Sequence, residues 1–277
     1  MKPLLVVDGD SFAHRAYHAL PKSIRRRDRG PGNALFGFSS MLLRLWQDER
    51  PRTVVVAWDT LETPTYRHEA LAAYQSGREF DDELLEQLAL LPGVVASSGL
   101  AVAKAPGYEA DDFLGAAVDF EEAAGGTTLV ATSDRDAFQL AGPRTTILQP
   151  VRGEAPTRIG PAEVRERYGV DPEQVPDFIA LRGDPSDRIP GARGIGPKKA
   201  ADLLAQYGSL DTMLEEGRFG AEADALRLYR TIATLDRSAP LPPLPDVAPD
   251  WAAAAAHAEE LGMDGLAGRF REAETWT

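Results

Sequence analysis

The first 160 residues alternate between short apolar runs and longer amphipathic stretches. Short runs of continuously hydrophobic, β-branched residues are typical of buried parallel strands, and spacings of three and four apolar positions are typical of helices. The expected strands span residues 4–7, 53–58, 127–131 and 145–148. The expected helices between them span residues 34–48, 83–91 and 109–124. This alternation predicts an α/β fold with a mostly parallel central sheet flanked by helices.

From about residue 161 the pattern changes to helices without strands. Proline- and glycine-rich segments separate these helices, and residues 239–249 are typical of an extended connector. The expected helices span residues 161–168, 172–182, 196–207, 221–235 and 250–272. We therefore predict two domains, an α/β core over residues 1–160 and a helical region over residues 161–277.

Composition narrows the class of protein. The chain has 277 residues, of which 43% are hydrophobic and 26% charged, as in an ordinary soluble globular protein. It contains no cysteine, which excludes disulfides, thiolate nucleophiles and cysteine-ligated metal sites. The apolar run near the N-terminus is too short for a signal peptide or a membrane span. We expect a cytoplasmic protein without a membrane partner.

Acidic residues follow three of the expected strands. Asp8 follows the first, Asp59 the second, and Asp134 with Asp136 the third. Since ligands bind at the carboxyl ends of parallel strands, we expect these side chains to share one edge of the sheet. Further acids lie at the start of the helix near residue 109 and in the irregular segment GDPSD. The full set is Asp8, Asp59, Glu109, Asp111, Asp112, Asp134, Asp136, Asp184 and Asp187.

Nine carboxylates in one cleft would repel one another or be forced to protonate unless cations were bound. Hard divalent cations prefer such oxygen ligands, and a pair of them is the usual apparatus for phosphodiester hydrolysis. Each acid alone is more often a turn residue or a helix cap, so the prediction depends on their repetition across several elements. The net charge of −13 falls to −4 when these nine are set aside, so it does not exclude a nucleic-acid partner.

The segment PGARGIGPKKAADLLAQ, residues 190–206, is the second signal. Its glycines permit a tight turn before a helix that begins at Pro197, and the free N–H groups of such a helix start can bind phosphate. It is not a P-loop, because Pro197 separates the last glycine from the lysines and no serine or threonine follows. It predicts a non-specific contact with the DNA backbone, with an ordinary turn between helices as the alternative. The predicted contacts are Gly191, Gly194, Gly196, Lys198 and Lys199.

A basic segment, KSIRRRDRG, covers residues 22–30. It suits a phosphate backbone if it lies near the acids, whereas a solvated surface loop is the alternative. His14 and His18 are four residues apart and can share a helix face, but without a third ligand nearby we interpret them as structural.

Six motifs occur in a fixed order over nearly the whole chain: VVDGDSFAHRAYHAL, VVAWD, YRHEA–YQSGR, GYEADD, TSDRDAFQL and GDPSDRIPGARGIGPKKAADLL. In this order they resemble the 5′-nuclease family, which includes the amino-terminal 5′–3′ exonuclease domain of bacterial DNA polymerase I, phage 5′ nucleases and flap endonucleases. The resemblance implies a PIN-like, resolvase-like core and a helix-hairpin-helix-type motif in the helical region. It also implies a structure-specific 5′–3′ exonuclease or flap endonuclease that uses two Mg²⁺ or Mn²⁺ ions.

The resemblance also implies roles for individual residues. All nine acids would be catalytic metal ligands, and residues 62–100 would include the arch through which the 5′ strand passes. The first ion would take Glu109, Asp111, Asp134 and Asp136, with Asp8 and Asp59 close by. The second ion would take Asp184 and Asp187, with Asp112 supporting. The predicted DNA contacts outside the glycine hairpin are Arg15, Arg25, Arg27, Arg67, Gln75 and Arg78, with Arg78 also catalytic.

The resemblance further implies partners. The substrate would be DNA with a 5′ flap, a nick, a gap or a free 5′ end, and K⁺ would bind at the glycine hairpin. A nucleoid-associated monomer that works beside a DNA polymerase and a ligase is the expected context.

Two positions depart from the family pattern. Gln75 stands where the family has a lysine that contacts the scissile phosphate, and Arg188 stands where the family has an asparagine. Loss of a cation at the reacting phosphate could cost a few kcal/mol of barrier. A DNA-binding protein with weakened catalysis is therefore the alternative to the nuclease. A phosphatase that uses Asp8 as its nucleophile would leave the glycine hairpin unexplained.

Overall fold

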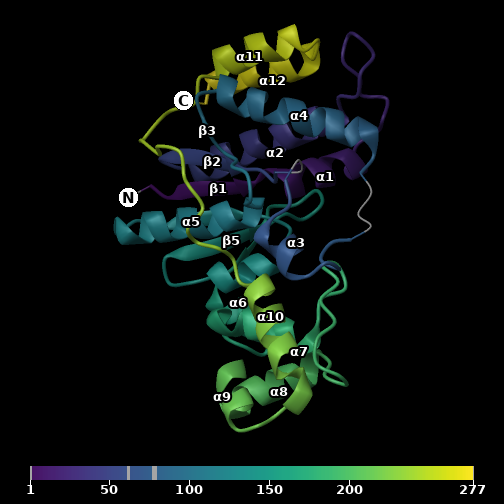
Figure 1. The fold of residues 1–277 in the computed structure, drawn as a ribbon. Helices are drawn as coiled ribbons and strands as arrows, with labels where there is room; N and C mark the ends of the chain where they lie inside the picture. The colour runs from purple at the N-terminus through teal and green to yellow at the C-terminus, as the bar shows by residue number, and fades with distance from the viewer. Residues whose placement is uncertain (1, 61–62, 77–79, 277) are drawn as a thin grey trace.

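A six-stranded sheet forms the centre of the protein, whose computed structural model describes residues 2–60, 63–76 and 80–276 (Figure 1). The strand order is β3-β2-β1-β4-β5-β6, and every pair is parallel except β5 with β6. The strands are β1 Leu4–Asp8, β2 Thr53–Ala57, β3 Ala101–Ala103, β4 Thr128–Ala131, β5 Thr145–Gln149 and β6 Thr157–Ile159. The prediction of a mostly parallel sheet is confirmed, whereas β3 and β6, with three residues each, were not predicted.

The position of β1 explains where the site forms. It pairs with β2 on one side and with β4 on the other, so the chain order reverses direction across it. In register, Asp8 lies opposite Ala57 of β2, and Val7 lies opposite Ala131 of β4. The residues that follow these three strands therefore leave the sheet at the same edge, which is the usual location of a ligand site.

Helices cover both faces of the sheet, because alternate residues of each strand point to opposite sides. Leu5 and Val7 of β1 pack into one core with α1 Gly9–Ala19, α2 Asn33–Glu49 and α4 Asp82–Ser97. Leu4 and Val6 pack into the other core, with α5 Ala110–Ala123 and the helices that follow. The helices predicted over residues 34–48, 83–91 and 109–124 are confirmed as α2, α4 and α5.

A helical region extends from the side of the sheet that α5 covers, in the lower half of Figure 1. Two short helices were not predicted, α3 Tyr66–Ala70 and α9 Leu210–Glu215, because five or six residues are too few for a helical pattern to be recognised. The stretches predicted as helical over residues 172–182 and 221–235 each contain a short 3-10 helix followed by an α-helix, whereas those over residues 161–168 and 196–207 are α-helical as predicted. The elements here are α3 Tyr66–Ala70, η1 Asp136–Leu140, α6 Pro161–Tyr168, η2 Pro172–Gln174, α7 Val175–Arg182, α8 Pro197–Tyr207, α9 Leu210–Glu215, η3 Gly220–Glu222 and α10 Ala223–Ala233.

The last part of the chain returns to the sheet. Residues 239–249 contain no helix or strand, as predicted for the connector, and Arg52 holds them by donating from Nη1 to the carbonyl of Leu244 at 2.8 Å. The stretch predicted as helical over residues 250–272 consists of two helices, α11 Trp251–Glu260 and α12 Asp264–Glu274. They pack on α4 and α2, so they follow the helical region in sequence but lie against the sheet's helical layer (Figure 1).

No helix in the part of the chain that the structure describes is both long enough and apolar enough to cross a lipid bilayer.

Candidate active site

A cleft of about 720 Å³ opens at the carboxyl edge of the sheet. Its acidic side chains come from the end of β1, the start of α1, the segment after β2, the start of α5, the segment after β4 and the loop after α7. They are Asp8, Asp10, Asp59, Glu109, Asp111, Asp134 and Asp187, and an eighth acid, Asp81, lines the cleft from the segment before α4. Six of the nine predicted acids therefore line one cleft. The other three, Asp112, Asp136 and Asp184, do not line it.

Asp8 lies at the floor of this cleft and is only 4% exposed. Its Oδ1 caps α1 by accepting from the Ser11 amide at 2.9 Å, and its Oδ2 accepts from the Thr132 hydroxyl at 2.6 Å. Burial, with added repulsion from Asp59 and Asp134, raises the pKa of Asp8 to about 7. Without a compensating cation, this carboxyl group is therefore partly protonated near neutral pH.

Asp10 is an acid of the cleft outside the predicted metal-binding set. Its Oδ2 accepts from the Asp59 amide at 2.7 Å, and burial, followed by repulsion from Asp59, raises its pKa well above the usual value. Its position two residues after Asp8, at the junction of β1 and α1, could have identified it as an acid of the same cleft. An acid in the first turn of a helix usually interacts with the helix dipole, and this structural explanation kept Asp10 out of the predicted set.

Asp111 provides a test of whether a cation fits. Its Oδ1 is buried and has no hydrogen-bond partner, and burial, followed by repulsion from Asp134, raises its pKa well above the usual value. Within the described residues, no three acidic or histidine side chains stand close enough to form a ready-made ligand set. The purely oxygen donors, the unsatisfied buried Oδ1 and the crowded charges nevertheless fit hard divalent cations, which compensate such crowding.

Asp136 and Asp184, on η1 and after α7, are outside the lining of the cleft. Burial, followed by repulsion from Asp134 and Asp187, raises the pKa of Asp136 well above the usual value. Asp184 accepts from the Ser186 amide at 2.8 Å and pairs with Arg182 at 3.3 Å. The structure therefore brings Asp136 into electrostatic contact with the segment that carries Asp184.

Asp112 and Arg67 form a buried bidentate ion pair. The two guanidinium nitrogens of Arg67 lie 2.6 and 2.9 Å from the two carboxylate oxygens of Asp112, and both side chains are at most 2% exposed. Arg67 also donates from Nε to the carbonyl of Ile232 at 2.9 Å. A DNA contact by Arg67 does not fit this burial, and the supporting metal role of Asp112 does not fit the engagement of both its oxygens. Both residues are better explained as a structural pair that joins α3, α5 and α10.

Gln75 lies between two acids of the cleft. Its Nε2 donates to Asp187 Oδ1 at 3.1 Å and to the Tyr74 hydroxyl at 2.9 Å. Tyr74 in turn donates to Glu109 Oε2 at 3.0 Å. Three hydrogen bonds therefore link the loop after α7 to the start of α5.

The predicted DNA contacts in the amino-terminal part have different surroundings. Arg15 lines the cleft beside His14 and His18, and the ring of His14 is 5.3 Å from that of Phe80. Arg25 and Arg27 lie outside the cleft and are ion-paired, with Glu83 at 2.7 Å and Asp264 at 2.6 Å. Arg78 lies outside the described residues.

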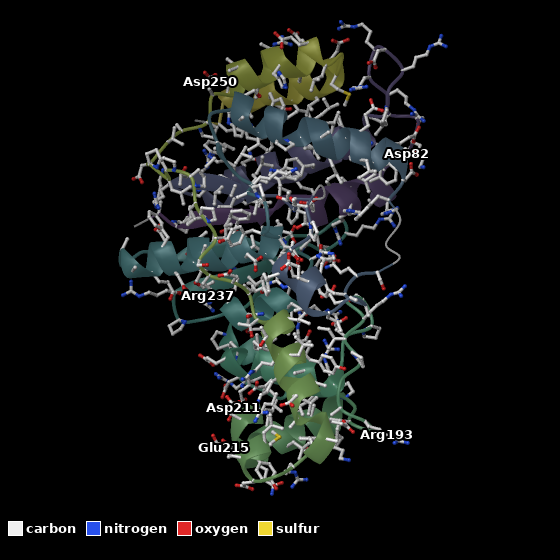
Figure 2. All side chains as sticks on the ribbon, viewed as in Figure 1. Asp82, Arg193, Asp211, Glu215, Arg237 and Asp250 are labelled. Carbon is white, nitrogen blue, oxygen red and sulfur yellow. The ribbon has the colours of Figure 1, made fainter. Side chains whose placement is uncertain are left out.

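The glycine hairpin joins α7 to α8, as the sequence predicted for a turn before a helix at Pro197. Gly191 has a φ of 75°, and a Cβ there would lie 2.4 Å from the Gly183 amide nitrogen, so no other residue fits. Gly194 and Gly196 face open space, and Lys198 and Lys199 are exposed. Arg193, in the same hairpin, lies near the lower end of the molecule in Figure 2, on the helical region.

Comparison with sequence families identifies both parts of the chain. Residues 3–169 match a family model described as the N-terminal, resolvase-like domain of 5′–3′ exonucleases. Residues 170–250 match the model of the C-terminal SAM fold of the same exonucleases. The chain is 38% identical over 255 residues to DNA polymerase I of Mycobacterium bovis. This aligned region covers 88% of this chain but only 28% of that polymerase, so the chain spans about a quarter of the relative's length.

Comparison with solved structures shows the same fold. A structure of T5 5′-exonuclease with bound divalent metal ions (zinc) matches with a TM-score of 0.72 at 18% identity, covering 98% of each chain. The catalytic core of Rad2 in complex with a DNA substrate matches with a TM-score of 0.62 at 15% identity, covering 98% of this chain and 91% of that one. At these identities the likeness concerns the fold, a resolvase-like sheet domain followed by a SAM-like helical one.

Proposed function

Because the chain belongs to the 5′–3′ exonuclease family, we propose that it is a structure-specific 5′–3′ exonuclease or flap endonuclease that hydrolyses DNA phosphodiesters near 5′ ends. The observation that supports this most strongly is the convergence of seven carboxylates at the carboxyl edge of the sheet, from six segments of the chain, in one cleft. Carboxylates crowded in this way repel one another and destabilise a protein, so such a cluster in a cleft indicates a functional site.

We propose two Mg²⁺ or Mn²⁺ ions as the cofactors. Asp8, Asp10, Asp59, Asp111 and Asp134 would hold the first, and the segment of Asp136, Asp184 and Asp187 would serve the second, with Glu109 between them. Bound there, divalent ions supply Lewis acidity to the scissile phosphate and offset the charge that develops on the leaving oxygen.

The chain's own residues would position the substrate around that centre. Arg15 lines the cleft and would contact a phosphate close to the acids. Gln75 offers a neutral amide at the same wall, so it would orient the phosphate by hydrogen bonding rather than neutralise its charge. Tyr74 holds Glu109 in place through its hydroxyl group.

The glycine hairpin would hold the duplex away from the cleft. Gly194 and Gly196 leave space for a phosphate to approach the backbone, and Lys198 and Lys199 add charge at the helix start. We propose K⁺ as the ion at this hairpin. In this arrangement residues 1–160 cleave the DNA and residues 161–250 bind the duplex, while α11 and α12 pack on the cleaving part.

The proposed substrates are DNA with a 5′ flap, nick, gap or free 5′ end, handled by a monomer that works beside a DNA polymerase and a ligase at the nucleoid. A catalytically weakened DNA-binding protein is the second candidate. It is favoured by one observation, the neutral amide of Gln75 at the wall of the cleft.

Cleavage of a 5′-labelled flap duplex distinguishes these two candidates. The assay compares Mg²⁺, Mn²⁺ and EDTA, with Asp134→Asn as the inactive variant. The nuclease predicts metal-dependent cutting near the flap junction that Asp134→Asn abolishes. Tight flap binding without cutting in either metal would instead support the DNA-binding protein.

A further inference from the structure

The loop between α1 and α2 carries five basic residues within residues 22–30. It projects beside the start of α4 and the α11–α12 pair (Figure 1), and Asp82, labelled in Figure 2, marks that start. Backbone bonds define its path, since the Arg27 amide donates to the carbonyl of Gly262 at 3.0 Å. The loop is thus fixed against two elements that are distant in sequence.

The first turns of α4 present carboxylates to this loop. Lys22 Nζ lies 2.8 Å from Asp81 Oδ2, and Arg25 Nη1 lies 2.7 Å from Glu83 Oε1. Asp81 is the N-cap of α4, and Glu83 lies in its first turn. The ammonium group of Lys22, through its hydrogen bond, lowers the pKa of Asp81 to about 2, so this acid is charged at neutral pH.

The pairing continues along the loop. Arg26 forms an ion pair with Glu86, one turn further along α4, and Arg27 Nη2 lies 2.6 Å from Asp264 Oδ1 of α12. Four consecutive cations of the loop therefore have carboxylate partners from outside it. The carboxylate side chains of these pairs are 34–69% exposed, and the least accessible cation is Arg26, at 11%.

This contact borders the cleft. Asp81 and Leu84 of α4 and His18 of α1 line the cleft together with the acids of the candidate metal site. DNA entering from this side would meet the loop and α4 together. A phosphate backbone and the carboxylates of α4 would then require the same ammonium and guanidinium groups.

We propose that the acidic start of α4 competes with DNA for the basic loop, an inference that rests on the proposed function. Ion pairs whose carboxylates are accessible to solvent are weak and screened by salt, so a densely charged backbone displaces the carboxylates of Glu83 and Glu86. Cations that are already paired contribute less to counterion release, which lowers both the affinity for DNA and its salt dependence. The competition weakens the binding of this loop to DNA of any sequence or structure.

The test uses the full chain with Glu83→Gln and Glu86→Gln combined, because amides keep the side-chain shape and remove the charge. Binding of a fluorescent 5′-flap duplex is measured by anisotropy in EDTA, which prevents metal-dependent cutting, over a range of salt concentrations. We expect Kd to fall about fivefold near 0.1 M salt, and the slope of log K against log salt to steepen by about two, one for each arginine released.

A matched control separates this effect from general charge. Asp48→Asn with Glu49→Gln also removes two negative charges. It also frees two arginines, since Asp48 pairs with Arg44 at 3.5 Å and Glu49 pairs with Arg158 at 2.7 Å. These pairs lie at the opposite end of α2 from the loop, so we expect Kd to stay within about twofold of the wild type.

Adding Arg25→Ala and Arg26→Ala to the α4 variant should remove the gain in affinity. Unchanged or weaker binding by the α4 variant overturns the competition, and so does an equal gain in the control. Those results leave wild-type DNA binding intact and concern the competition alone. Absence of flap binding by the wild type at any salt concentration overturns the proposed function as well.

Discussion

Gln75 Nε2 donates a hydrogen bond to Asp187 Oδ1 at 3.1 Å and so joins the segment after α3 to the loop after α7. The backbone of Gln75 has a φ of 46°, in the left-handed region that non-glycine residues seldom adopt. This backbone conformation places the amide of Gln75 beside an acid of the cleft, and local strain of this kind occurs at functional sites.

Gln75→Lys should increase the rate of flap cleavage. A lysine at this place keeps the contact with Asp187 and adds a positive charge near the phosphate that reacts, which stabilises the charge of the transition state. We expect an increase of about tenfold in the single-turnover rate with saturating Mg²⁺, equivalent to about 1.4 kcal/mol. Gln75→Ala is the control and should be slower than the wild type. A lysine variant that is no faster would show that the amide itself is the functional group.

Metal-free protein should lose stability as the pH rises. The folded-state pKa of Asp8 is raised from 3.8 to about 7, so between these values the folded state binds more protons than the unfolded state. The free energy of unfolding therefore falls with rising pH across this window. We expect the melting temperature in EDTA to be about 5 °C lower at pH 7.5 than at pH 5.5.

Mg²⁺ should reverse that trend, because it stabilises the ionised carboxylates. Thermal denaturation with and without metal at the two pH values measures both effects. A melting temperature in EDTA that rises with pH would contradict the crowding of protonatable acids in the cleft.

Arg67→Ala should destabilise the protein rather than weaken its contact with DNA. It would leave the buried charge of Asp112 without its cation, with only the amides of Glu109 and Asp236 still donating to it, which costs about 3–5 kcal/mol. Urea denaturation measures this loss. Asp134→Asn is the control, since it relieves repulsion in the cleft and should not lower the stability of metal-free protein. Normal stability with reduced DNA affinity in Arg67→Ala would instead support the predicted contact of Arg67 with DNA.

Gly196→Ala should separate DNA binding from folding at the hairpin. Position 196 has a φ of −95° and open space around its α-carbon, so alanine fits there without strain. A methyl group would nevertheless obstruct a phosphate that approaches the backbone. We expect unchanged thermal stability and about tenfold weaker binding to duplex in EDTA. Gly191→Ala is the contrasting variant, which should destabilise the protein because its Cβ meets the Gly183 backbone.

The sequence was sufficient to predict four of the six strands and the edge at which the acids meet, because continuous apolar runs are buried parallel strands and their ends share an edge. It could not distinguish Asp111 from Asp112. Adjacent residues of a helix point in directions about 100° apart, so one faces the cleft and the other faces Arg67. That difference depends on the rotation of α5 against the sheet.

The sequence also did not predict the ion pairs between residues that are distant in the chain. The basic loop is compatible with an exposed DNA contact by sequence, yet Arg25 pairs with Glu83, which is 58 residues away. Nothing in a local charge pattern shows that the loop would fold beside α4. Asp10 was missed for a different reason, since an acid at a helix start has an ordinary structural explanation.

The most direct test of the central claim is the rate of single-turnover flap cleavage as a function of Mg²⁺ concentration, with Asp111→Asn in parallel. If the carboxylates of the cleft hold two divalent ions, the rate should rise with an order of about two in Mg²⁺, and Asp111→Asn should require much more metal or be inactive. Cleavage that persists in EDTA, or an Asp111→Asn variant with the Mg²⁺ dependence and rate of the wild type, would contradict a metal centre built from these acids.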